Sequence, residues 1–247
     1  MKRTYADLHL CPDLRNDEQV ESVIKSASQL GYSLIGIPLP QNFPEEKIQQ
    51  LKNLCRGNKM DFASRVDLNP KTSKELIRSL RRLRRQFEII AVTCKSKQVA
   101  RQAAKDRRVD LLNFPFHDPR KRFFDKAEAE LASNALASME IDMESLLTLA
   151  GRSRIRFLSS LRREVTIAEN FHIPVIISSG ASNELLMRKP RGMAALASLF
   201  DLSKPLSTDA ISKNPRAIVE RNREKLNPQF VAPGIRLIRR GEDCQKR

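Results

Sequence analysis

The 247-residue sequence contains no tryptophan, two tyrosines and three histidines, and this scarcity disfavours two classes of site. A nucleic-acid surface built on aromatic base stacking needs more aromatic side chains than the chain supplies. A hydrolytic metal site needs several histidines and carboxylates, and the only histidines are His9, His117 and His172. A stacking platform and a histidine-rich metal centre are therefore both poor interpretations.

Paired cysteines and long apolar runs are absent as well. The four cysteines begin at Cys11 and lie 44, 39 and 150 residues apart, so no CxxC pair indicates a zinc knuckle or a disulfide framework. The longest uncharged apolar stretch, residues 173–181, is far shorter than the roughly 18–20 residues needed to cross a membrane. Residues 1–7 lack the apolar core of a signal peptide. We expect a cytoplasmic protein with buried free thiols and no membrane partner.

Positive charge is abundant. The chain has 45 lysines and arginines against 29 aspartates and glutamates, a formal net charge of +16. Its hydrophobic residues, 40% of the total, are enough for a folded core. A large positive excess on a folded domain indicates a polyanionic partner.

Strand-like apolar runs alternate with amphipathic helical stretches along the chain. The runs cover residues 5–10, 34–39, 62–68, 89–94, 109–114, 139–143 and 174–178. The helical stretches cover residues 18–30, 45–55, 73–86, 96–106, 126–138, 145–170, 190–200 and 214–225. Such repetition with short connections predicts an α/β, TIM-barrel-like fold of seven or eight parallel strands with outer helices. We expect residues 1–230 to form this single domain and residues 231–247 a charged, partly flexible tail.

The densest charge lies at residues 78–108, where eleven lysines and arginines face only Glu88 and Asp106. On a helical wheel the apolar side chains of residues 76–87 share one arc, and Arg78, Arg81, Arg82 and Arg85 occupy the opposite arc. Like charges four residues apart destabilise a lone helix. A solvated face and a surface for an external anion are both consistent with this pattern.

Further cations fall near loops. Lys95 and Lys97 follow the fourth expected strand at the carboxyl end of the barrel, whereas Arg107 precedes the fifth strand and belongs to the opposite end. The loop at residues 113–124 interleaves four phenylalanines with His117 and the run Arg120, Lys121 and Arg122. That composition suits phosphate and a stacked base, unless the phenylalanines pack beneath the loop and the cations face water.

Two groups of residues resemble catalytic sites. Asp7 and His9 share one face of the first strand, and Asp67 with Glu140 or Asp142 could join them as metal ligands. Hydrogen bonding of Asp7 and His9 to each other or to nearby loops is the structural alternative.

The second group, Ser178, Ser179 and Gly180, follows the seventh strand, where barrels often bind phosphate. Its alternative role is a polar cap on the next helix.

Several strings resemble one known family. They are residues 5–9 (YADLH), 122–132 (RFFDKAEAELA), 173–182 (IPVIISSGAS) and 188–196 (RKPRGMAAL). They are similar to component 3, the thirty-kilodalton type of protein subunit in archaeal and eukaryal ribonuclease P. The resemblance covers about residues 4–226, and the chain's length favours the archaeal branch.

The resemblance implies a barrel of the polymerase-and-histidinol-phosphatase type. It also implies a ribonucleoprotein that removes 5′ leaders from precursor tRNA, with catalysis by the RNA and its Mg²⁺ ions. A small RRM-like protein subunit, in a two-plus-two assembly, and the other subunits of the holoenzyme are the implied protein partners. Catalytic barrels of this class begin with His-x-His, but here His9 is followed by Cys11. The departure implies a decayed hydrolytic site.

We therefore expect a non-catalytic RNA-binding subunit of ribonuclease P that holds no metal or cofactor itself. The alternative is an autonomous metal-dependent phosphoesterase or nuclease built on Asp7 and His9. A small-molecule barrel enzyme would leave the charge of +16 unexplained. The residues expected to contact RNA are Lys95, Lys97, Arg101, Arg107, His117, Arg120, Lys121, Arg122, Ser178, Ser179, Gly180 and Arg191.

Overall fold

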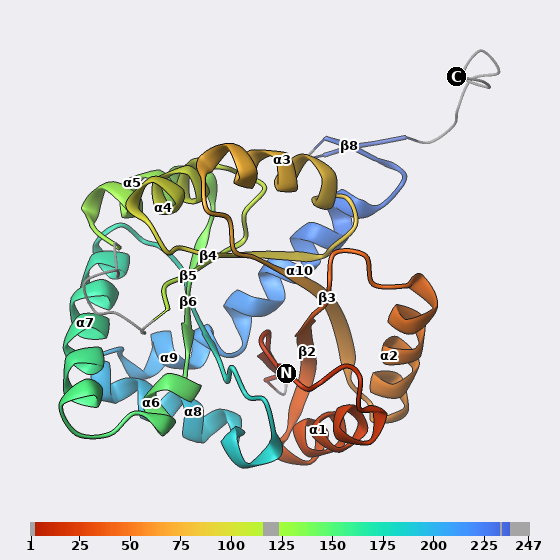
Figure 1. The fold of residues 1–247 in the computed structure, drawn as a ribbon, viewed down its shortest axis with the longest axis horizontal. Helices are drawn as coiled ribbons and strands as arrows, with labels where there is room; N and C mark the ends of the chain where they lie inside the picture. Colours follow the sequence, from red (N-terminus) through yellow and green to blue (C-terminus); the bar gives the residue numbers. More distant parts are fainter. Residues whose placement is uncertain (1–2, 116–123, 233, 238–247) are drawn as a thin grey trace.

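Seven parallel strands form one curved sheet with helices around it (Figure 1) in the computed structural model, which describes residues 3–115, 124–232 and 234–237. The strands pair in chain order, each with the next. They are β1 (Tyr5–Asp7), β2 (Tyr32–Pro38), β3 (Asp61–Leu68), β4 (Ile89–Thr93), β5 (Leu111–Asn113), β6 (Ser138–Asp142) and β7 (Val175–Ser178). The predicted α/β barrel is confirmed, with seven strands in the barrel sheet.

The helices connect the strands and cover the outside of the sheet. They are α1 (Asp17–Leu30), α2 (Glu45–Gly57), α3 (Ser73–Leu83), α4 (Lys97–Lys105), α5 (Lys126–Ala135), α6 (Glu144–Thr148), α7 (Gly151–Asn170), α8 (Pro190–Leu196), α9 (Lys204–Ala210) and α10 (Lys213–Leu226). The single helix expected at 145–170 is wrong: Gly151, with φ of +54°, begins a second helix after a break. The helix expected at 190–200 ends at Leu196 and continues as a 3₁₀ turn, and α9 was not expected.

The barrel closes at a seam between β1 and β7 that contains no strand pairing beyond one bridge. At the carboxyl end of the seam, Leu10 bridges Ala181, and the Cys11 amide donates to the Ala181 carbonyl at 2.8 Å. At the amino end, the Ala6 amide donates to the Ile211 carbonyl at 2.9 Å, so the chain just after α9 borders β1 there. The closure is thus made by loops at one end and by the α9 segment at the other.

Helix α10 lies across the amino-terminal end of the barrel, behind the strands in Figure 1. Its Ile218 and Val219 pack against small and aliphatic side chains of the barrel interior. Asn222 donates to the Glu88 carbonyl and to Asp110, each at 2.8 Å. The amino-terminal end is therefore sealed by packing and hydrogen bonds, which leaves the carboxyl end as the open end of the barrel.

The expected C-terminal tail begins within a short hairpin, β8 (Phe230–Ala232) and β9 (Ile235–Arg236). Residues 238–247 lie outside the described part of the chain. None of the described helices is long and apolar enough to cross a membrane.

Candidate functional site

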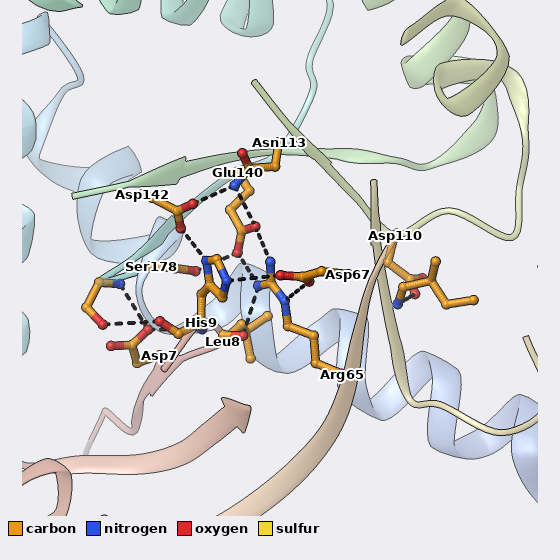
Figure 2. Close-up of polar contacts among 12 residues, drawn as sticks. Asp7, Leu8, His9, Arg65, Asp67, Asp110, Asn113, Glu140, Asp142 and Ser178 are labelled. Carbon is orange, nitrogen blue, oxygen red and sulfur yellow. Dashed lines mark hydrogen bonds and ion pairs between the residues drawn. The ribbon is translucent and has the colours of Figure 1, made fainter. Parts of the chain in front are cut away.

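Arg65 on β3 lies at the centre of the barrel mouth, with its side chain 1% exposed (Figure 2). Its two terminal nitrogens donate to both oxygens of Glu140 at 2.6 and 2.7 Å, and Nε donates to Asp67 Oδ1 at 2.6 Å. Nη1 also donates to the Leu8 carbonyl at 2.9 Å. One guanidinium thus ties β1, β3 and β6 together through charge-assisted bonds.

His9 bridges two carboxylates beside this guanidinium (Figure 2). Its Nδ1 lies 2.7 Å from Asp142 Oδ1, and its Nε2 lies 3.1 Å from Asp67 Oδ2. Burial and the charge of Arg65 oppose protonation of the imidazole, but the two carboxylates outweigh them and raise the pKa of His9 well above its ordinary value. The ring is therefore held as a second cation in the mouth.

A divalent metal ion does not fit this arrangement. His9, Glu140 and Asp142 lie close enough for one atom of each to share an ion. However, Glu140 already binds Arg65 through both oxygens and accepts from Ser178 Oγ at 2.8 Å. Asn113 donates to the second oxygen of Asp142 at 2.6 Å. An ion at these atoms would have to displace Arg65, His9 or Asn113 from the carboxylates, and in the structure the ligand set proposed for a phosphoesterase forms an ion-pair network.

Asp7 has the structural role that was the alternative to metal binding. Its Oδ1 accepts from the amides of His9 at 3.2 Å and Ser179 at 3.0 Å, which fixes the loop after β7 against β1. Its other oxygen is buried without a partner in the described structure. Burial raises the pKa of Asp7 to about 6 from an ordinary value of 3.8, against the lowering effect of its hydrogen bonds.

Replacement of Asp7 by asparagine is expected to change the pH dependence of stability. The pKa of Asp7 is higher in the folded state than in the unfolded state. The contribution of Asp7 to the free energy of unfolding is therefore complete below pH 3.8 and is lost as the pH rises to about 6. Asparagine stays neutral, so the stability of Asp7→Asn relative to wild type should rise by up to about 3 kcal/mol between pH 4 and pH 7. Urea unfolding at several pH values measures this difference, and a difference independent of pH would contradict the raised pKa.

Gly36 on β2 allows β1 to approach closely enough for the Leu8 carbonyl to reach Arg65. A Cβ atom at Gly36 would lie 2.5 Å from the Leu8 oxygen, a backbone atom that cannot turn aside. We expect Gly36→Ala to lower the free energy of unfolding by about 1–3 kcal/mol, by urea denaturation. Gly57→Ala is the control, because nothing lies within 4 Å of its Cβ, and it should be neutral or slightly stabilising. Equal effects of the two variants would contradict the close approach.

The loop expected to bind phosphate is already saturated by protein groups. Ser178 donates to Glu140, Ser179 Oγ donates to the His9 carbonyl at 3.3 Å, and the Gly180 amide donates to the same carbonyl at 2.9 Å. Ser178 and Ser179 are buried, and a Cβ at Gly180 would meet Asp142 at 3.2 Å. With these donors used and carboxylates adjacent, this loop closes the barrel and offers no free donor of this kind to a phosphate.

The other residues predicted to contact RNA lie elsewhere. Lys95 and Arg107 are exposed at opposite ends of the barrel wall, and Arg191 is exposed on α8. Lys97 forms an exposed ion pair with Asp125 at 3.1 Å, and Arg101 lies 3.3 Å from Glu128. His117, Arg120, Lys121 and Arg122 fall outside the described residues. Among the described residues, the members of the predicted set therefore do not all lie in one site.

Helices α3 and α4 are neighbours (Figure 1). Both expose several cationic side chains. Leu76, Leu80 and Leu83 of α3 are buried, as the helical wheel predicts, while α4 exposes cations at four-residue spacing. We call the exposed cations of these two helices and of the turn after α3 the outer basic face: Lys74, Arg78, Arg81, Arg82, Arg85, Lys97, Arg101 and Lys105. Arg85 lies in that turn, because α3 ends at Leu83 and not at residue 86 as expected. Arg84, at the flank, belongs to the core instead, since it binds Asp110 at 2.5 Å.

Most of the outer basic face on α3 lacks an acidic partner. Within the described residues, Arg78, Arg81 and Arg85 form no ion pair or side-chain hydrogen bond, and Arg82 contacts only the amide of Gln41. Unpaired like charges on one helix raise the local potential and favour a bound polyanion.

Sequence reasoning missed Arg65 and Asn113. Arg65 stands at an alternate position of an otherwise apolar strand, on the same strand face as Asp67, and a charge in that pattern is a usable sign of an interior ion pair. Nothing local indicates that Glu140, 75 residues away, is its partner.

Comparison with known proteins gives consistent matches. The family model described as RNase P subunit p30 matches residues 4–227. The chain is 28% identical over 235 residues to ribonuclease P protein component 3 of Methanosarcina barkeri, covering 95% of each chain. It is 29% identical over 241 residues to the same component of Methanosarcina mazei, covering 96% of this chain and 95% of that one.

Two solved structures share the fold. A chain in a cryo-EM structure of archaeal ribonuclease P with mature tRNA superimposes with a TM-score of 0.83 at 21% identity, covering 95% of this chain and 98% of that chain. Histidinol phosphate phosphatase from Lactococcus lactis, complexed with zinc, L-histidinol and phosphate, superimposes with a TM-score of 0.51 at 9% identity, covering 89% and 94%. At these identities the two likenesses show the fold of the barrel.

Proposed function

The chain belongs to the RNase P subunit p30 family, and we propose that its task in the enzyme is to bind and stabilise the RNA through the outer basic face. It is a protein subunit of ribonuclease P, the enzyme in which RNA is the catalyst. The observation that carries the proposal is the array of unpaired arginines on α3 beside the cationic stripe of α4. Arginine and lysine bind phosphates without reading base identity, which suits recognition of a folded RNA by its backbone.

The ion pairs on α4 are compatible with this role. Lys97 and Asp125 have side chains 51% and 43% exposed, and exposed pairs contribute little to stability. A phosphate can therefore replace such a carboxylate at small cost. Lys95, Arg107 and Arg191 remain predicted RNA contacts at the edges of this surface or beyond it.

The geometry of the mouth supports a non-hydrolytic role for the chain itself. A hydrolase of this barrel class would need an open metal position and an accessible nucleophile. Arg65 fills the centre of the mouth, and His9 is bridged between two carboxylates. In this proposal the Mg²⁺ ions belong to the RNA, and the enzyme works in the cytoplasm on precursor tRNA. A small RRM-like subunit is its direct protein partner, and the other subunits complete the assembly.

Cleavage of precursor tRNA by a reconstituted enzyme tests the function. We expect activity of the RNA with the other subunits to rise when this chain is added, and the chain with Mg²⁺ alone to be inert. Cleavage by the chain alone, abolished in Asp7→Ala, would show instead that the barrel is an autonomous nuclease.

A further inference from the structure

A cavity of about 680 Å³ opens beside the amino-terminal end of β1, away from the barrel mouth. It is bounded by Tyr5 of β1, by α8 and by the α9 segment, which borders β1 where an eighth strand would complete the barrel. The cavity therefore lies where short helices, and not an eighth strand, follow β7 in closing the barrel.

The walls of this cavity are apolar and its rim is cationic. Tyr5, Leu202 and Ile211 supply an aromatic ring and aliphatic side chains. Arg3, Arg191 and Lys204 also line it, with the hydroxyls of Ser198, Ser207 and Thr208, and no acidic residue is among the lining residues that the structure describes. Among the described residues, none of the side chains of these three cations has an ion pair or hydrogen bond. The chain has only two tyrosines, and one of them faces this cavity.

We propose that this cavity binds one nucleotide of a single-stranded RNA segment, with the base against Tyr5 and the flanking phosphates at Arg3, Arg191 and Lys204. The volume is in the range of pockets that hold nucleotide-sized ligands. An aromatic ring beside unpaired cations is the combination that binds an unstacked base and its phosphate. An acidic peptide would satisfy the cations but would make no specific use of the flat ring.

This inference rests on the proposed function, because it assigns a second contact with the same RNA. The outer basic face and the cavity are separate: α3 and α4 lie along one side of the barrel, and α8 and α9 lie along the opposite side (Figure 1). The first surface has exposed cations alone and suits the backbone of a duplex. The cavity adds an apolar recess, which only an unpaired base can enter.

Fluorescence anisotropy with the full chain tests the cavity, using a labelled ten-nucleotide single-stranded RNA and the same strand as a duplex. Tyr5→Leu should weaken single-strand binding roughly 5- to 100-fold and leave duplex binding unchanged, whereas the affinity of Tyr5→Phe should stay within about twofold of wild type.

The double variant Arg191→Gln with Lys204→Gln should reduce the slope of log K against log salt for single-strand binding by about 1.4. The control pair, Lys25→Gln with Lys47→Gln, removes the same charge from exposed positions on α1 and α2.

The outcomes separate the two proposals. If the cavity variants bind single strands as wild type does while variants of the outer basic face lose RNA, the cavity inference is overturned and the proposed function stands. If neither set affects RNA binding, both fail. If the cavity variants lose a protein subunit of the reconstituted enzyme but keep full RNA affinity, the cavity is a protein interface and the inference is wrong. If Tyr5→Leu does not fold, the substitutions at the exposed residues Arg191 and Lys204 still test the inference.

Discussion

Replacement of Arg65 by methionine is expected to lower the free energy of unfolding by about 3–5 kcal/mol, the largest effect of any single substitution considered. Methionine approximates the length of the side chain but removes its charge and every hydrogen bond. Glu140, which is fully buried, would then lack its bidentate partner, and Asp67 would lose one of its two cations. A carboxylate left unpaired in an apolar interior costs far more than the original pair contributes.

Chemical denaturation of the variant and of a matched control measures this effect. Arg78→Met makes the same substitution at an exposed position without an ion pair, and it should change stability by less than about 0.5 kcal/mol. Combining Arg65→Met with Glu140→Gln should cost less than the sum of the two single changes, because the second removes the buried charge that the first leaves behind. A stability of Arg65→Met close to wild type would show that the guanidinium does not hold the mouth together.

Neutralising two arginines of α3 and one in the turn after it is expected to cause the largest loss of RNA binding. Arg78, Arg81 and Arg85 changed together to glutamine should reduce the dependence of log K on log salt by about 2–3 units, about one for each lost phosphate contact. The helix itself should not suffer, because the change relieves the like-charge repulsion between Arg78 and Arg82 at four-residue spacing, worth a few tenths of a kcal/mol.

Titration of the ribonuclease P RNA into the chain at several salt concentrations gives the slope. The control removes three exposed cations from α1 and α2, as Lys25, Lys47 and Arg56 changed to glutamine, with the same effect on net charge. Equal slopes for the two triple variants would mean that net charge, and not the outer basic face, attracts the RNA. A thermal melt of each variant distinguishes lost contacts from lost folding.

Local patterns were sufficient for the architecture and for the basic face of one helix. The alternation of apolar runs and amphipathic stretches determined the parallel barrel, because burial of both sheet faces imposes it on the chain segment by segment. The arrangement of Leu76, Leu80 and Leu83 opposite the arginines of α3 also followed from spacing alone. The break before Gly151 was missed, because the residues on either side continue a helical pattern.

Contacts between segments far apart in the chain could not be predicted from the sequence. The loop at Ser178–Gly180 looked like a phosphate site, but its donors meet Asp7, His9 and Glu140 from other strands. The pattern of Asp7 and His9 indicated metal ligands. In the structure the guanidinium of Arg65 on β3 lies beside them and binds Asp67 and the Leu8 carbonyl.

The sequence by itself determined the class of fold, the polyanionic partner and the basic face of α3, since each depends on composition or on the period of a single element. Only the tertiary structure decided that Arg65 pairs with Glu140 and that Tyr5, Arg191 and Lys204 surround one cavity. These groups meet because the strand register and the seven-stranded closure bring together side chains up to about two hundred positions apart, and pairings over that distance leave no trace in the local pattern.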